Sequence, residues 1–109
     1  MVNTMSNETR RIELQYELES TLGSTNVYFQ PPESINIKYP AIIYERSGIQ
    51  NVHADNSVYT GSCVYRIIVI DPDPTSEIVE KVSKQYPTIK YNRHYVINKL
   101  NHDVFLLYY

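Results

Sequence analysis

The spacing of hydrophobic residues near the start of the chain predicts an amphipathic helix over residues 8–22. Asn7 is suited to cap its first turn, and Gly23 lies just beyond its end, where a left-handed backbone is common. Five residues form the expected apolar face: Ile12, Leu14, Tyr16, Leu18 and Leu22. The same residues also alternate as in a strand, but the glutamates between them are poor strand formers and favour the helix.

Three strands are predicted to follow this helix. The first covers residues 26–30 and ends at Pro31, because proline cannot donate to a strand ladder. The second covers residues 41–46. Residues 47–57 are polar and too many for a hairpin turn, so they are predicted as a projecting loop of the kind that often carries function. The third strand covers residues 58–71, and its apolar run from residue 67 to 70 predicts a central position with cover on both faces.

A second helix and two further strands complete the pattern. Asp73 followed by Pro74 predicts the N-cap and first residue of a helix that Pro87 stops. Its apolar face is expected to consist of Ile78, Val79, Val82 and Tyr86. Residues 91–109 read as two strands joined by a tight turn, so that the sequence ends inside its sheet. The order is α-β-β-β-α-β-β, which predicts an α+β fold with two helices packed on one sheet.

Length and composition agree with one small domain over residues 1–109. The apolar runs are four or five residues long, well short of the roughly 20 that span a bilayer, so no membrane partner is expected. The first residues lack the apolar core of a secretory signal, which favours synthesis in a cytoplasm. A single cysteine, Cys63, excludes an internal disulfide and a zinc site with several cysteines, and it is expected to be a small buried side chain.

Charge and aromatic content bear on the partners. The net charge is -2 and the ten Lys and Arg residues are spread along the chain, which argues against tight binding of nucleic acid. Eleven tyrosines stand beside two phenylalanines and no tryptophan. Tyrosine suits surfaces that are wet in a monomer and covered in an assembly, although strands also favour aromatic residues in general.

Candidate chemistry is sparse. Asp71 and Asp73 could bind a hard cation, but too few acidic residues lie nearby, and turn and cap chemistry explains both. His53 with Asp55 and His102 with Asp103 pair imidazole with carboxylate, but no nucleophile motif accompanies them. No catalytic, metal-binding or cofactor-binding residue is therefore assigned, and the chain is not expected to be an enzyme. A small enzyme that uses His102 and Asp103 is the alternative from that class.

A nucleic-acid-binding module is a further alternative. Tyr91, Arg93 and Tyr95 are spaced to share one face of a strand, where aromatic and basic side chains can stack the bases of a single strand. Without a wider basic groove, this face is expected to pack on a helix or on a neighbouring subunit instead.

Three stretches of the chain carry a more specific signal. The first joins Val-Tyr-Phe-Gln-Pro-Pro-Glu-Ser at residues 27–34 with Tyr-Pro-Ala-Ile-Ile-Tyr at residues 39–44. The second combines Ala54-Asp55-Asn56 and Tyr59 with Val-Ile-Asp-Pro-Asp-Pro at residues 69–74. The third is Asn-His-Asp-Val-Phe at residues 101–105. Together they span most of the chain, and they resemble a family of small tail-completion, or tail terminator, proteins of long-tailed bacteriophages.

This resemblance implies a structural role in the virion. Tail terminators are α+β subunits that close into a sixfold ring, dock on the last ring of the tail tube protein, stop its polymerisation and offer a face to the head–tail connector protein. It implies a homo-hexamer in the tail or neck, with DNA passing through the lumen without specific binding. A head-side connector, head-closure or minor capsid protein is the alternative. The expected interface residues are Gln50, Asn51, His53, Asp55, Asn56, Tyr59, Tyr91 and Arg93.

Overall fold

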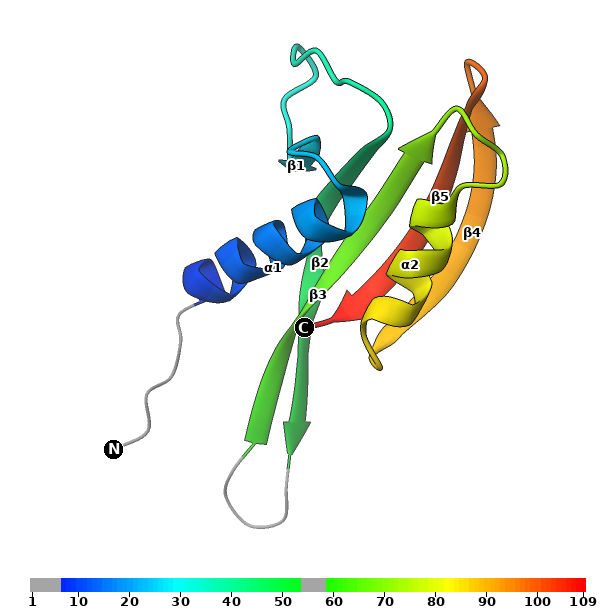
Figure 1. Ribbon diagram of the computed structural model, residues 1–109. Coiled ribbons are helices and arrows are strands. Elements are labelled where there is room, and N and C mark those ends of the chain that lie inside the picture. Colours follow the sequence, from blue (N-terminus) through cyan, green and yellow to red (C-terminus); the bar gives the residue numbers. More distant parts are fainter. Residues whose placement is uncertain (1–6, 54–58) are drawn as a thin grey trace.

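The computed structural model describes residues 7–53 and 59–109 and confirms the α+β fold and the predicted order of elements (Figure 1). The interface predictions for Asp55 and Asn56 lie outside the described residues. The elements are α1 (Asn7–Leu22), β1 (Val27–Phe29), β2 (Ala41–His53), β3 (Tyr59–Asp71), α2 (Glu77–Gln85), β4 (Ile89–Ile97) and β5 (Leu100–Tyr108).

The five strands form one sheet in the order β1-β2-β3-β5-β4. β1 runs parallel to β2, with Val27 beside Ile42, and all other neighbours are antiparallel. The central position predicted for the apolar run of β3 is therefore confirmed. β4 and β5 form the expected hairpin, whose turn residues Asn98 and Lys99 have φ of 52° and 64°, as a type I′ turn requires.

Helix α1 begins at Asn7 and ends as predicted. Gly23 has a φ of 82° and donates its N–H to the carbonyl of Glu19 at 2.8 Å, which satisfies one of the last helical carbonyls. Leu14 and Leu18 are completely buried and Leu22 is half-buried. The expectation that Ile12 and Tyr16 widen this face was wrong, because they are 37% and 65% exposed. A step of two residues turns a helix by about 200°, so both point away from the sheet.

Helix α2 begins later than predicted. Its N-cap is Ser76, whose hydroxyl accepts the N–H of Ile78 at 3.2 Å, and not Asp73. The Asp73 carboxylate instead accepts the N–H and the hydroxyl of Thr75, at 2.9 and 3.0 Å, and so closes a turn before the helix. The predicted apolar face is confirmed: Val82 is buried, and Ile78, Val79 and Tyr86 pack against the core.

The loop predicted at residues 47–57 was wrong over residues 47–53, where β2 continues to His53, and its remaining residues lie outside the described ranges. A bulge between Arg46 and Gly48 shifts the register, and the pairing with β3 then continues to His53 and Tyr59. Glycine and asparagine are depleted in strands, which made this stretch look like a loop. The stretch is nevertheless a strand, because antiparallel pairing with β3 satisfies its main-chain N–H and C=O groups.

The core lies between one face of the sheet and the two helices, which Figure 1 shows on the same side. Tyr44, Ile67 and Phe105 are partners across β2, β3 and β5, and all three are completely buried on this side. The opposite side of the sheet, which we call the open face, carries the partners Ile43, Ile68 and Val104. The sequence predicted cover on both faces of the apolar run in β3, but the helices cover only one of them. Cys63, expected to be buried, is half-buried beside the core.

Tyrosine side chains connect the helices to the sheet. The hydroxyl of Tyr44 donates to Gln15 at 2.6 Å and accepts from Arg11, and burial raises its pKa. The Glu17 carboxylate on α1 accepts hydrogen bonds from Tyr86, after α2, and Tyr109, after β5. Tilted or edge-on ring contacts join neighbouring members of one row: Phe29, Tyr44, Tyr65, Tyr109 and Tyr86. The polar ends of these rings thus fix the positions of both helices.

Replacing Leu18 with alanine tests the assignment of the buried helix face. We expect Leu18→Ala to lower the free energy of unfolding by about 2–5 kcal/mol, because a completely buried side chain leaves a cavity. The matched control is Ile12→Ala on the outward side, which we expect to change it by less than about 0.5 kcal/mol. Urea unfolding measures both, and equal effects would contradict the assignment.

Candidate interaction surfaces

The far parts of β2 and β3 form a two-stranded arm beyond the rest of the sheet. β5 pairs with β3 as far as Val64, which lies opposite Tyr108, and Tyr109 donates its N–H to the carbonyl of Cys63. Beyond this point β2 and β3 pair only with each other in the described part of the chain. We call this segment, residues 48–53 and 59–63, the arm, and Figure 1 shows it projecting from the sheet.

The arm carries four of the predicted interface residues: Gln50, Asn51, His53 and Tyr59. His53 lies opposite Tyr59 in the register, so the sequence positions on either side of residues 54–58 are adjacent in space. Ile49 is 60% exposed. An antiparallel pair whose two outer edges find no further strand among the described residues is a template for pairing with another chain.

β4 provides the second candidate surface at the opposite edge of the sheet. It pairs with β5 alone among the described strands, and all of its residues except Ile89 and Tyr95 are exposed. Tyr91 and Arg93 do not share a face, contrary to the prediction. A bulge at residue 92 sets Tyr91 opposite Phe105, on the helix side, whereas Arg93 lies opposite Val104 on the open face, which it shares with Tyr95.

Tyr91 is held in place by β5. Its hydroxyl donates to the Asp103 carboxylate at 2.8 Å, and its ring meets the Phe105 ring edge-on at 5.3 Å between centroids. Desolvation, together with the hydrogen bond and the negative charge of Asp103, raises the pKa of Tyr91 to about 12. The residue is 53% exposed, so it offers both an apolar ring and an engaged hydroxyl to a partner.

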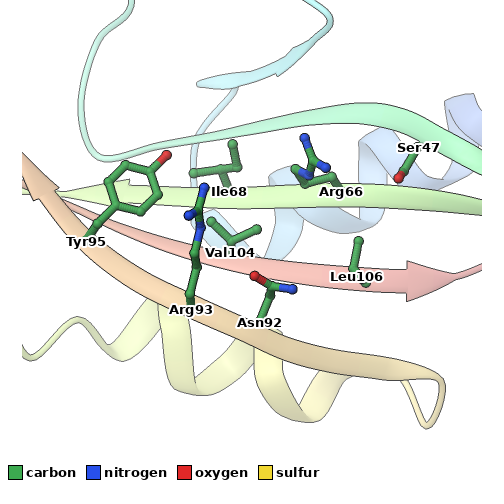
Figure 2. Close-up of a pocket in the computed structure, with 8 residues that line it drawn as sticks. All are labelled: Ser47, Arg66, Ile68, Asn92, Arg93, Tyr95, Val104 and Leu106. Carbon is green, nitrogen blue, oxygen red and sulfur yellow. The ribbon is translucent and has the colours of Figure 1, made fainter.

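The open face contains a hollow of about 370 Å³ over β3, β5 and β4 (Figure 2). Its lining consists of Ser47, Arg66, Ile68, Asn92, Arg93, Tyr95, Val104 and Leu106. Arg66 forms an ion pair with Glu45 at 2.9 Å. The Arg93 guanidinium lies 5.1 Å from the centre of the Tyr95 ring, which stacks on His102 at 4.7 Å and 15°. This face combines fixed cations with an apolar floor.

The candidate catalytic pair His102 and Asp103 does not form a site, and the other pair, His53 with Asp55, lies partly outside the described residues. His102 and Asp103 are consecutive strand residues, so their side chains lie on opposite faces, His102 beside Tyr95 and Asp103 beside Tyr91. Asp71 accepts the N–H of Asp73 at 2.9 Å, which confirms the turn chemistry predicted for both. Within residues 7–53 and 59–109, no three His, Cys, Asp or Glu side chains are grouped so that they could hold a metal ion.

Sequence reasoning missed the role of Arg66 and of the hollow beside it. The alternation of Arg66, Ile67 and Ile68 does indicate that Arg66 and Ile68 share a face. It does not indicate which strands bring other basic residues to that face. Arg93 joins it only because of the bulge in β4, and that bulge is visible only in the register with β5.

Replacing Tyr91 with phenylalanine tests its coupling to Asp103. A pKa raised from 10.0 to about 12 means that the folded state favours the neutral hydroxyl. The stability that this hydroxyl contributes is present below a pH of about 10 and is lost as the pH rises through about 12. We therefore expect wild-type stability to fall more steeply than that of Tyr91→Phe over this window, as measured by urea midpoints.

Tyr16→Phe is the control, because it removes a hydroxyl from a residue that is 65% exposed on α1. This variant should follow the wild-type pH dependence. If wild type and Tyr91→Phe lost stability in parallel across the same window, the hydrogen bond to Asp103 would not stabilise the fold.

Comparison with models of known protein families gives no match, and comparison with curated proteins gives none. Among the described residues, no helix is both long enough and apolar enough to cross a membrane. A functional proposal for this chain therefore depends on the surfaces described above and on the resemblance carried by its sequence motifs.

Proposed function

We propose that this chain is a tail terminator of a long-tailed bacteriophage, a structural protein without cofactor that closes into a ring of six copies. The ring caps the tail tube, ends its polymerisation and offers a new surface to the head–tail connector. The three motif stretches support this proposal. Two of them contribute to β1, the first part of β2 and the end of β3, and the third lies at the start of β5.

The observation that carries the proposal is that the chain has two different surfaces at separate places on its sheet. A closed ring uses a heterologous interface, in which each copy contributes one patch to the preceding neighbour and another to the next. The arm extends from β2 and β3, and β4 forms the far edge. Because the surfaces differ in shape and position, one copy can use both at once.

The charge of the chain suits a lumen through which DNA slides. A net charge of -2 gives no general attraction to phosphate, so DNA passes without specific binding. The subunit is made in the bacterial cytoplasm and becomes part of the virion at the tail or neck. Its function is assembly and not catalysis.

Loss of the protein should give tails of uncontrolled length or tails that do not join heads. A tube without its terminator has no signal to stop growing and no surface for the connector. Negative-stain electron microscopy of particles assembled without the protein measures both. Normal joined virions would contradict the proposal, and labelled protein found on the head side of the neck would favour a head connector instead.

A charge on the arm should weaken assembly without unfolding the subunit. We expect Ile49→Asp to leave the monomer folded, because the side chain is 60% exposed, and to weaken ring formation by about tenfold or more. Light scattering gives the mass, and circular dichroism checks the fold. Ile35→Asp, at a residue that is 40% exposed between β1 and β2, is the matched control. Assembly of Ile49→Asp at wild-type concentrations would exclude the arm from the interface.

A further inference from the structure

The open face is a basic surface on an acidic chain. Direct strand partners place Arg66, Lys90 and Arg93 on it, and Glu45 is the acidic residue beside Arg66. Arg66 is already paired with Glu45, whereas Arg93 has no carboxylate within ion-pair distance in the described part of the chain. The surface therefore has a cation available to an acidic partner.

The floor beneath these cations is apolar. Ile68, Val104 and Leu106 line the hollow, and the helices lie on the other side of the sheet. In Figure 2 the side chains of Arg93 and Tyr95 extend from β4 toward Ile68 and Val104. The contact of Arg93 with Tyr95 holds the guanidinium at the rim. An occupant of this hollow needs an apolar ridge with an acidic edge.

Helix α1 has such a ridge on its outward side. Ile12 and Tyr16 lie one turn apart and are 37% and 65% exposed. Glu8 and Glu13, both exposed, flank this pair on the two sides of the ridge. The buried side of α1 is already committed to the core. The outward ridge thus has the apolar character and the negative charge that complement the open face.

We propose that the outward ridge of α1 from a second copy of this chain docks in the hollow of the open face. Ile12 and Tyr16 contact the apolar floor, and Glu13 pairs with Arg93. This inference rests on the proposed function, because it adds a contact between successive subunits of the ring to those proposed for the arm and β4. Oppositely charged groups around an apolar centre fix the register of such a contact.

The positions of the two surfaces agree with a head-to-tail contact. α1 packs beside β1 and β2, from which the arm extends, whereas the hollow lies over β3, β5 and β4. Within one copy the ridge and the hollow lie on opposite sides of the sheet and cannot meet. Each copy can therefore give its ridge to one neighbour and its hollow to another, as ring closure requires.

Charge reversal at Glu13 and Arg93 tests the contact in the full chain. We expect Glu13→Arg and Arg93→Glu each to raise the dissociation constant for self-association by about tenfold or more, because like charges then face each other. Glu33→Arg and Lys81→Glu make the same kinds of charge change at exposed residues away from both surfaces, and they should associate like wild type. Light scattering measures the mass, and circular dichroism confirms that each variant is folded.

An equimolar mixture of the two single variants is the decisive sample. In an alternating assembly, the basic side chain introduced by Glu13→Arg would face the acidic side chain introduced by Arg93→Glu, and the next junction would be the wild-type pair. Each variant alone should associate more weakly than wild type, and the two together should restore the wild-type mass. Co-expression of the two variants should likewise restore tail-to-head joining. This second readout detects the contact even if the ring forms only on the tail.

Three results would overturn the inference. The first is association of either single variant at wild-type strength, and the second is failure of the mixture to recover in both readouts. The third is binding of a single-stranded oligonucleotide or a polyglutamate peptide that Arg93→Glu abolishes while self-association persists. If the mixture of variants does not restore association, but the virus still requires the protein for normal tails, this contact is rejected and the tail-terminator function is not. Rescued association, with normal virions in the absence of the protein, rejects the tail-terminator function alone.

Discussion

The burial of the sheet on one face is the constraint on which the rest of the structure depends. Both helices lie on the same side, where Leu14, Leu18 and Val82 meet the aromatic and aliphatic residues of β2, β3 and β5. Covering one face provides enough apolar burial for a small domain. It also leaves the other face to be covered by the long side chains of its own strands, chiefly Arg66 and Arg93.

This one-sided arrangement explains why polar chemistry gathers where it does. On the helix side, tyrosine hydroxyls must find partners, and Glu17 and Gln15 on α1 supply them. On the open face, the cations remain beside solvent and above apolar residues. A surface with these two properties is suited to recognition.

The sequence predicts those parts of the fold that have local signals. Gly23 marks a helix end through its backbone chemistry, and the spacing of Leu14 and Leu18 reveals the buried side of α1. The arm has no such signal, because it contains glycine and asparagine, which are depleted in strands, and its pairing is set by the register with β3. Asp73 and Ser76 are both good caps, and only the turn formed after Asp73 decides between them.

The candidate surfaces were harder to predict than the core. Tyr91 and Arg93 are two positions apart, which in a regular strand places both side chains on one face. Their separation depends on the bulge that forms in pairing with β5, which no local pattern encodes. For the same reason, the meeting of Arg66 and Arg93 around one hollow follows from the order of strands and not from any stretch of sequence.

The Glu17 carboxylate has a consequence for the order in which the chain can fold. It binds Tyr86 and Tyr109, which follow it by 69 and 92 residues. Contacts of such high sequence separation form slowly, because the intervening chain must first be brought together. During synthesis α1 emerges before every strand that it covers, and Glu17 lacks its second partner until β5 has been made. Helix α1 can therefore contact β1 and β2 early, through Gln15, but the hydrogen bonds of Glu17 form only after the later elements are present.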